Sequence, residues 1–258
     1  MKKHLLAVDI GNTSISFGIF RGRKLIKVFR VATGLNDKET ELQLRKNLKK
    51  YSALIEDAII CSVVPKKTII VKIILRKLLG VLPKIAGEDI KIPIKNLYKN
   101  QRQVGKDRLV AACACKHFYG APAVVIDFGT AITFDYVNKN GEYEGGIISP
   151  GIEISLDALA QRTALLPRIK MRSPREFLGK STTDSITSGA ANGLSLMCDG
   201  IIRTFKMKYS KNIKVIATGG YASFFKKRCA GIDLVDKNLI LKGLFLSNDR
   251  LPIGTKAA

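Results

Sequence analysis

The fold is decided by the stretch Val8-Asp9-Ile10-Gly11-Asn12-Thr13-Ser14-Ile15-Ser16, which returns later in the chain as Ile126-Asp127-Phe128-Gly129-Thr130-Ala131-Ile132-Thr133-Phe134. Both copies keep the order apolar, Asp, apolar, Gly, Asn or Thr and then small, followed by alternating apolar and hydroxyl residues. An apolar run precedes each copy, and the period-two alternation that follows is typical of a second strand. Each copy is therefore predicted to be a β-hairpin with a carboxylate, a glycine and hydroxyl groups at its tip.

The residue types at these tips suit a phosphate ligand. Glycine lets the backbone turn tightly and approach a ligand closely. Backbone N–H groups and hydroxyls can donate hydrogen bonds to phosphate oxygens, and an Asp at the end of a strand can hold a cation directly or through water. An ordinary Asx turn without a ligand would explain one copy alone. Two matching copies favour two tips that grip a nucleoside triphosphate and its metal across a cleft.

Composition places the chain among globular proteins that bury a substantial core. Of its 258 residues, 46% are hydrophobic and 25% are charged, which is usual for that class. The longest apolar stretch, around residues 68–79, is interrupted by Lys72, Arg76 and Lys77 and is too short to span a membrane. Asp9 interrupts the apolar run at the start, which argues against a signal peptide. The expectation is a cytoplasmic protein.

Cysteine and histidine usage gives little support to a disulfide framework, a metal cluster or a hydrolase triad. The five cysteines are odd in number and scattered, and Cys113 and Cys115 are two apart on an expected helix, so they point to different faces. Buried structural thiols are the better interpretation. Neither of the two histidines sits in a recognisable nucleophile–base arrangement.

The net charge of +23 is unusual and suggests affinity for anions, including nucleotides and nucleic acids. The lysines are spread along the chain, however, which favours solvated faces over a dedicated patch. The sequence also lacks a helix-turn-helix, zinc or bZIP signature. No specific nucleic-acid partner is therefore expected.

Strands and helices alternate along the chain, which predicts an α/β fold with parallel strands. In the helix expected over residues 37–51, Leu42, Leu48 and Tyr51 should face inward. The helix that begins at Pro65 should bury one side and expose the other; the buried side would hold Ile69, Ile70, Ile73, Ile74 and Leu78, and the exposed side Lys66, Lys67 and Arg76. The plan repeats in the second half, which divides the chain into domains at 1–118 and 119–258.

Three further segments have the composition of functional loops. Residues 90–103 are polar and lack a clear period, and Val104-Gly105-Lys106-Asp107-Arg108 then leads into a helix. The helix dipole at that start favours a carboxylate and any anionic substrate group. The segment Gly179-Lys180-Ser181-Thr182 precedes a long helix but is not a Walker A loop, because Pro174 stands where the upstream glycine is required. Thr218-Gly219-Gly220 ends a strand.

Two Asp-Gly hairpins and a strand-ending Thr-Gly-Gly resemble the sugar kinase, actin and heat-shock ATPase superfamily. The ordered set of motifs resembles the type III pantothenate kinase family more specifically, over about residues 5–247. The motifs that carry this resemblance are Asp9–Thr13, Val104–Arg108, Asp127–Asp135, Gly145-Gly146, Ser149-Pro150-Gly151, Thr163–Pro167 and Gly179–Thr182. The resemblance implies two related actin-like (ribonuclease H-like) domains that face each other across an ATP cleft, with the Gly-Gly turn on the nucleoside side.

The same resemblance implies transfer of the ATP γ-phosphoryl group to the primary hydroxyl of pantothenate, giving 4′-phosphopantothenate, the first step of coenzyme A biosynthesis. Asp107 would be the general base. The triphosphate would be held by Asp9, Ile10, Gly11, Asn12, Thr13, Ser14, Ile15 and Ser16, and by Thr130 from the second domain. Pantothenate would be bound by Tyr98, Gly105, Lys106, Asp107, Arg108 and Thr182.

The implied cofactors are Mg²⁺ with ATP, near Asp9 directly or through water, and a monovalent cation, K⁺ or NH₄⁺, at Asp127. The implied assembly is a homodimer whose interface completes the substrate site. The residues themselves leave simpler alternatives open: Asp107 and Arg108 could be a cap and a surface ion pair, Tyr98 a packing aromatic and Thr182 a helix cap. Lys180 is interpreted as a solvated lysine.

The chain departs from the family pattern at two positions of the substrate loop. Gln101 stands where the family usually has Pro, and Ala111 where it often has Asn. These departures concern the geometry of the pantothenate loop rather than the ATP machinery. Two alternative functions are a different small-molecule kinase on the same scaffold, such as a sugar kinase, and a non-catalytic basic regulator that binds nucleic acid.

Overall fold

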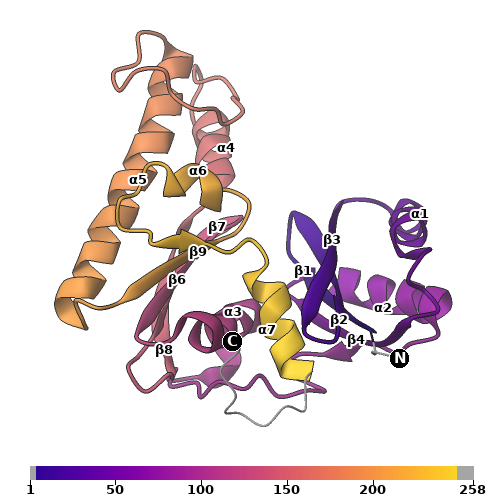
Figure 1. Ribbon diagram of the computed structural model, residues 1–258. Helices are drawn as coiled ribbons and strands as arrows, with labels where there is room; N and C mark the ends of the chain where they lie inside the picture. Colours follow the sequence, from indigo (N-terminus) through magenta and orange to yellow (C-terminus); the bar gives the residue numbers. More distant parts are fainter. Residues whose placement is uncertain (1–3, 249–258) are drawn as a thin grey trace. The chain divides into compact units, whose positions relative to one another are not determined.

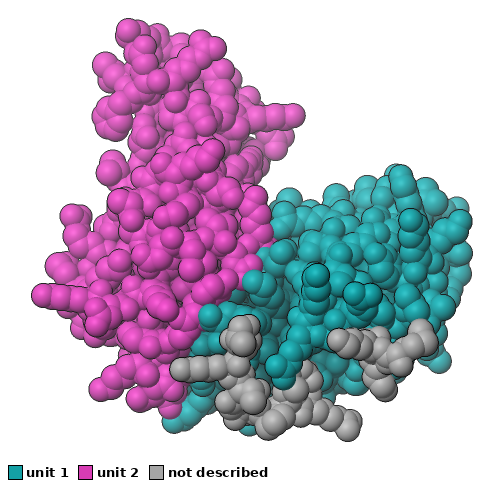
Figure 2. All heavy atoms as spheres, in the orientation of Figure 1, with its two compact units in different colours: residues 1–118, 238–258 teal, residues 119–237 magenta. Residues whose placement is uncertain are grey.

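The structure is a computed structural model and describes residues 4–248 (Figure 1). The chain forms two compact units, coloured separately in Figure 2: residues 1–118 with 238–258, and residues 119–237. The division of the sequence at 118/119 coincides with the first of these boundaries. The last helix, however, belongs to the first unit, whereas the sequence-based division placed it in the second.

The first unit is built on a five-stranded mixed sheet of order β3-β2-β1-β4-β5. Strands β1, β2 and β3 form an antiparallel meander, and β4 and β5 run parallel to β1. Five of the seven β1 residues are apolar and buried, as expected of a strand with neighbours on both sides. The strands are β1 His4–Ile10, β2 Ser14–Arg21, β3 Lys24–Ala32, β4 Ile55–Ser62 and β5 Lys84–Ile85.

The helices of the first unit begin and end at the residue types that helix ends favour. Asn36 caps α1 in a full capping box with Glu39, and Gly80 closes α2 in the left-handed conformation, at φ 69°. Gly243 allows α7 to pack closely on α3, because a Cβ there would lie 2.2 Å from the carbonyl oxygen of Val110. The helices are α1 Asp37–Leu48, α2 Pro65–Leu79, the 3₁₀ turn η1 Gln101–Gln103, α3 Lys106–Tyr119, whose last residue falls in the second unit, and α7 Leu239–Asn248.

The predicted inward faces of α1 and α2 were partly wrong. Leu42 is 65% exposed, and the adjacent turn buries Thr40 and Leu44 instead. On α2, Ile69 and Ile73 are more than 60% exposed, while Lys67 is buried. The Lys67 ammonium donates to the Leu35 carbonyl at 2.7 Å and to Thr40 Oγ1 at 2.9 Å. Hydrogen bonds thus bring a lysine inside, which hydrophobic periodicity cannot anticipate.

The second unit repeats the plan with a five-stranded sheet of order β10-β9-β6-β7-β8. Strands β6, β7 and β8 form the antiparallel meander, and β9 runs parallel to β6. The core lies between this sheet and the second half of α5, where Phe128, Phe134 and Ile202 are buried together. The elements are β6 Ala123–Phe128, β7 Ala131–Val137, β8 Tyr143–Pro150, α4 Ile152–Arg162, α5 Thr182–Lys208, β9 Lys214–Thr218, α6 Ala222–Lys226 and β10 Leu234–Val235.

The prediction of two related α/β domains, each opened by an Asp-Gly hairpin, is confirmed. All five cysteines are buried thiols, as expected. Within residues 4–248 the structure contains no helix with the length and apolarity needed to cross a membrane.

Candidate active site

The first hairpin tip, Gly11-Asn12-Thr13, connects β1 to β2 and is held from outside the hairpin. The Gly11 amide donates to the Ser14 carbonyl at 3.1 Å and closes the turn. Thr33, which follows β3, donates from its backbone amide to the Thr13 carbonyl at 3.1 Å and from its hydroxyl to the Gly11 carbonyl at 2.7 Å. These bonds use carbonyl groups, and the exposed side chains of Asn12 and Thr13 remain at the surface. The tip is thus a rigid, polar loop suited to phosphate oxygens.

The carboxyl edge of the first sheet brings Asp9 close to the start of α3. Asp9 pairs with Cys61 across the parallel strands β1 and β4. The pKa of the Cys61 thiol lies well above its ordinary value, because the thiol is buried and because the carboxylates of Asp9 and Asp107 act on it. The Lys106 ammonium, in contrast, lowers the pKa of this thiol. Two carboxylates and an ammonium from distant parts of the sequence are therefore near enough to influence the pKa of one buried thiol.

The start of α3 is shaped by Gly105. A Cβ on Gly105 would lie 2.4 Å from Asp107 Oδ1, so only glycine leaves room for that carboxylate. Asp107 Oδ1 also accepts a hydrogen bond from the Arg108 amide at 2.9 Å. Burial raises the pKa of Asp107, an effect that this amide and the Arg108 guanidinium oppose. A carboxylate with a raised pKa at a helix start has the properties of a general base.

The loop before α3 carries Tyr98, which is half-buried. Asn96 organises this loop, because its side-chain oxygen accepts from the Tyr98 amide at 3.0 Å. The Gln101 side chain donates to the Asn96 carbonyl at 2.9 Å. Gln101 thus fastens the loop with a hydrogen bond at the position where the family usually has a proline. Ala111, the second departure, is buried within α3.

The second hairpin tip, Gly129-Thr130, is enclosed by two glycines from other elements. Gly151, at the end of β8, donates from its amide to the Thr130 carbonyl at 3.1 Å, and a Cβ there would lie 2.3 Å from that oxygen. Gly219, in the Thr-Gly-Gly turn after β9, lies against Asp127: a Cβ there would be 2.3 Å from Asp127 Oδ1. The half-buried Asp127 carboxylate therefore lies directly against a backbone turn.

The turn after β9 leads into an aromatic cluster. The Tyr221 amide donates to the Phe128 carbonyl at 3.2 Å, and the rings of Phe128 and Phe225 stack with centroids 4.4 Å apart. The Tyr221 hydroxyl donates to the Glu153 carboxylate. Burial and that carboxylate raise the pKa of Tyr221 to about 12. The Thr-Gly-Gly turn, which is expected on the nucleoside side, is therefore linked by this hydrogen bond to the end of β6, directly before the second tip.

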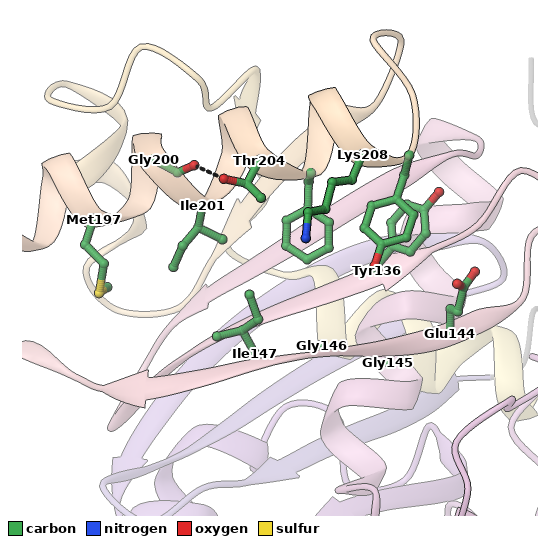
Figure 3. A pocket seen from close by; sticks show the side chains of 12 residues that line it. Tyr136, Glu144, Gly145, Gly146, Ile147, Met197, Gly200, Ile201, Thr204 and Lys208 are labelled. Atoms are coloured by element: carbon green, nitrogen blue, oxygen red, sulfur yellow. Dashed lines mark hydrogen bonds between the residues drawn. The ribbon is translucent and has the colours of Figure 1, made fainter.

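A pocket of about 520 Å³ lies elsewhere in the second unit, between β8 and the second half of α5 (Figure 3). None of the residues predicted for ATP, pantothenate or cations lines it. The pocket is therefore separate from the candidate active site.

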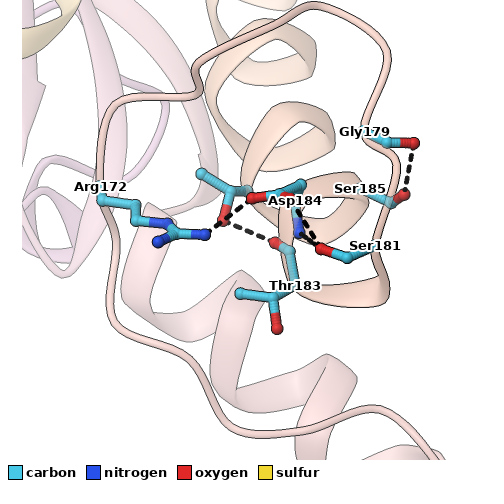
Figure 4. A network of polar contacts seen from close by, with 7 residues as sticks. Arg172, Gly179, Ser181, Thr183, Asp184 and Ser185 are labelled. Carbon is cyan, nitrogen blue, oxygen red and sulfur yellow. Dashed lines mark hydrogen bonds and ion pairs between the residues drawn. The ribbon is translucent and has the colours of Figure 1, made fainter.

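Thr182 is the first residue of α5 and is exposed. Figure 4 shows the polar contacts of its neighbours Ser181 and Asp184 at the start of this helix. Ser181 caps the helix by accepting from the Asp184 amide at 3.1 Å, and its hydroxyl donates to the Asp184 carboxylate at 2.7 Å. Arg172 from the preceding loop pairs with the other oxygen of Asp184 at 2.7 Å. These partners lower the pKa of Asp184, with the Ser181 hydroxyl as the largest cause. The loop is thus fastened to the helix turn that presents Thr182.

The predicted site residues divide between the two units. The first unit holds Asp9 to Ser16, Tyr98 and Gly105 to Arg108, and the second holds Asp127, Thr130 and Thr182. Sequence reasoning missed Thr33, Gly151 and the closeness of Cys61 to both carboxylates. Gly151 had a visible signal in the Ser149-Pro150-Gly151 motif, whereas Thr33 and Cys61 reach the site only through strand pairing.

Comparison with known proteins agrees with this geometry. The sequence profile described as type III pantothenate kinase matches residues 5–204. The chain is 41% identical to the type III pantothenate kinase of Finegoldia magna, over 96% of this chain and 98% of that protein. It is 37% identical to the type III pantothenate kinase of Halalkalibacterium halodurans, over 94% and 97%.

Solved structures share the fold at low sequence identity. The ethanolamine utilization protein EutJ from Carboxydothermus hydrogenoformans aligns with a TM-score of 0.56 and 13% identity, over 96% of this chain and 91% of that one. A ROK family glucokinase from Streptomyces griseus, in complex with glucose and AMPPNP, aligns with a TM-score of 0.51 and 13% identity, over 95% and 99%. Together with the two hairpin tips and the Asp107 helix start, the profile match and the identity over almost the whole chain show that this protein belongs to the type III pantothenate kinase family.

Proposed function

We propose that this protein transfers the γ-phosphoryl group of ATP to the primary hydroxyl of pantothenate, forming 4′-phosphopantothenate for coenzyme A biosynthesis. One observation carries the assignment of residues: Asp9 at the end of β1 pairs with Cys61, and the start of α3 packs near the same end of the sheet, where Lys106 lies against Gly87 after β5 and Asp107 raises the pKa of Cys61. Family membership supports the choice of substrates.

The first tip is proposed to hold the triphosphate, through the backbone and side chains of Asp9 to Ser16. Phosphoryl transfer depends mainly on positioning and charge neutralisation, so a rigid loop is what it requires. The two hydrogen bonds from Thr33 support this role, because they immobilise the loop by its carbonyl groups. Its remaining polar groups can then point to a ligand.

Asp107 is proposed to accept the proton of the pantothenate hydroxyl as that oxygen attacks the γ-phosphorus. Its burial raises its pKa, which increases the basicity of the carboxylate, while the Arg108 amide and guanidinium act to lower that pKa. The guanidinium of Arg108 also suits the carboxylate of pantothenate, for which its fork of donors allows a bidentate contact. Gly105, Lys106 and Tyr98 would complete this side of the substrate site.

Thr182 is proposed to reach pantothenate from the partner subunit of a homodimer. The second unit offers exposed apolar side chains to such a partner on α5 and on the loop between α4 and α5. Leu165, Phe177, Leu178 and Leu196 are each at least 65% exposed there. Such side chains would be covered if this part of the second unit formed an interface. The fastening of the loop to Asp184 would hold Thr182 in place at the interface.

Asp127 is proposed to hold a monovalent cation, K⁺ or NH₄⁺, and Thr130 a phosphate oxygen of ATP. The donor set fits a hard cation, since a carboxylate oxygen lies beside the backbone of the Thr-Gly-Gly turn. When bound, the cation supplies positive charge beside the phosphates. Asp127 itself positions that charge, and Gly219 leaves the space for it.

Asp9 is proposed to hold Mg²⁺ together with the ATP phosphates, directly or through water. Within residues 4–248 no three His, Cys, Asp or Glu side chains are grouped to hold a metal by themselves. A single carboxylate at a phosphate tip nevertheless fits Mg²⁺, which commonly uses one or two carboxylates and completes its shell with water and phosphate. The ion supplies charge neutralisation on the triphosphate.

The decisive experiment is ADP release with pantothenate as acceptor, in buffers that contain either potassium or sodium. The expected result is pantothenate-dependent ADP release that is faster in potassium. Hexoses serve as competing acceptors, and activity on a sugar alone would replace the proposal with a sugar kinase. Binding of duplex DNA with sequence preference, without pantothenate-dependent ADP release, would instead support the basic regulator.

A further inference from the structure

The pocket between β8 and α5 is an open groove in the second unit (Figure 3). Its volume of about 520 Å³ lies within the usual range for small-molecule sites. Strand β8 forms one wall with Glu144 to Ile147, and α5 forms the other with residues from Met197 to Lys208. All of these residues belong to one compact unit, so the groove is a property of that unit alone.

Small residues keep the groove open on both walls. Gly145 and Gly146 leave β8 without side chains at this point, and Gly145 has a φ of 147°, which disfavours other residues. On the opposite wall, a Cβ added to Gly200 would meet no atom within 4 Å. Thr204 folds back onto the helix, where its hydroxyl donates to the Gly200 carbonyl at 2.9 Å. The cavity therefore results from the residue types that line it.

One end of the groove is aromatic. The rings of Tyr136, Phe205 and Tyr209 form a triangle, with centroid separations of 4.7 Å for the two tyrosines and 5.7 Å from each tyrosine to Phe205. Tyr136 and Phe205 are buried, whereas Tyr209 is 52% exposed. Met197, Ile201 and Ile147 line the other end, which is aliphatic. The groove thus offers an apolar bed with a ring-binding end.

Charges of both signs stand at the rim. Glu144 projects from β8 and Lys208 from the last turn of α5 (Figure 3). In the described part of the chain neither side chain forms an ion pair, so both are available to a ligand. Burial and the nearby Glu144 raise the pKa of Tyr136, so the carboxylate acts at the aromatic end. An ammonium group there would meet a carboxylate and ring faces together, a combination that favours organic cations.

The aromatic end of the groove lies at the far end of the sheet from the phosphate tip, whereas Met197 at the aliphatic end accepts a hydrogen bond from Ser149, near that tip. Tyr136 pairs with Gly145, whereas Ala131, beside the tip, pairs with Pro150 at the other end of the same strand pair. Tyr136 lies five residue steps along the strand from Ala131, which corresponds to roughly 17 Å. Helix α5 connects the groove to Thr182 over its 27 residues. A ligand whose ring occupies the aromatic end would not compete directly with ATP at the second tip.

We propose that this groove binds a small amphipathic zwitterion: an apolar body with an aromatic or planar group, an ammonium group that pairs with Glu144, and an anionic group that pairs with Lys208. The aromatic triangle would receive the ring, and the aliphatic end would receive the rest of the body. This site is additional to the sites proposed for ATP and pantothenate.

The test uses a charge series on one apolar body. The dipeptide phenylalanyl-leucine is the zwitterion, its N-acetyl form is the anion and its C-terminal amide is the cation. Binding of each to the full chain is measured by isothermal titration calorimetry, and NMR amide shifts locate the site. The zwitterion should bind most tightly and shift amides of β8 and the second half of α5. No binding by any of the three, or equal binding by all three, would overturn the proposal.

Variants separate the groove from the rest of the surface. Gly200→Leu places a side chain into the open space and should weaken the zwitterion about tenfold or more. Gly193→Leu is the matched control, because it lies on the same helix, is also open to a Cβ and does not line the groove. Both changes replace glycine within a helix and should preserve folding. Equal loss of binding in the two variants would contradict the assignment.

The charged groups are tested separately. Lys208→Gln should weaken the zwitterion and the anion about two- to fivefold and leave the cation unchanged, as expected for an exposed pair. Glu144→Gln should weaken the zwitterion and the cation by a similar factor. Lys206→Gln on the same helix is the control and should leave all three unchanged. Loss of selectivity in the control but not in Lys208→Gln would refute the charge assignment.

Discussion

Gly219 and Asp127 are so close that the glycine has room for no side chain: a Cβ on Gly219 would lie 2.3 Å from Asp127 Oδ1 and 2.7 Å from the Phe128 carbonyl oxygen. Gly219 also has a φ of 91°, a conformation that favours glycine. The position of the carboxylate proposed to hold a monovalent cation is therefore limited by a turn that lies almost a hundred residues further along the chain.

Gly219→Ala is expected to displace Asp127 and to remove the dependence of activity on potassium. Because the change adds both a clash and a disfavoured φ, it should also cost about 1–3 kcal/mol of stability. Gly220→Ala is the matched control, since a Cβ there meets nothing within 4 Å. Rates of ADP release in potassium and in sodium, together with thermal melts of both variants, check this prediction. A Gly219→Ala protein that kept its potassium preference would contradict it.

Asp107→Asn is expected to reduce kcat by about 10²–10⁴-fold, the usual contribution of a general base. The same change should raise stability at neutral pH. Burial raises the folded-state pKa of Asp107 above the model-compound value of 3.8, so stability is greatest below that value and falls as pH rises through the folded pKa. Asparagine is uncharged, so the variant does not lose stability by burying an ionised carboxylate.

The stability gain of Asp107→Asn should therefore be fully present above the raised folded pKa, shrink as pH falls through that pKa, and be lost at about pH 4 and below. Thermal melts of both proteins between pH 4 and pH 8 measure it. Asp157→Asn on α4 is a control for loss of a carboxylate away from this site. Equal pH dependence in wild type and Asp107→Asn would show that the burial of Asp107 has no effect on stability.

Ser181→Ala is expected to cost about 0.5–2 kcal/mol through loss of the helix cap. If the capped turn positions Thr182, the KM for pantothenate should rise more than the KM for ATP. Ser210→Ala, a loop serine in the same unit that does not cap α5, is the control. Steady-state kinetics with each substrate varied in turn check this. A purely structural effect would lower activity without changing the ratio of the two KM values.

Lys67→Met is expected to destabilise the first unit by about 1–3 kcal/mol, because the Leu35 carbonyl and the Thr40 hydroxyl would lose a buried donor. Lys66→Met, one residue away and exposed, should change stability by less than about 0.5 kcal/mol. Urea unfolding of the two variants measures the difference. Equal midpoints would mean that the buried ammonium contributes nothing to stability.

Hydrophobic periodicity and the residues at turns and helix ends predicted much of the fold, because these features depend on residues that are close together in the sequence. The alternation after Asp9 and after Asp127 predicted the two hairpins, and Pro65 predicted the start of α2. The inward face of α1 could not be predicted in the same way. A helix of low hydrophobicity presents several possible faces, and only packing decided that Leu44 rather than Leu42 is buried.

By itself, the sequence determined the two Asp-Gly tips, the two-fold α/β plan and the helix start at Gly105, because these depend on the order of residues within one turn or one strand. Tertiary structure decided that Asp9 pairs with Cys61 and that Asp107 also influences that thiol, that Thr33 holds the first tip and that Gly219 bounds Asp127. These relationships join segments from separate parts of the sequence through strand pairing and close packing. Hydrophobic periodicity within one segment does not predict such contacts, because they form only when the strands of each sheet pair.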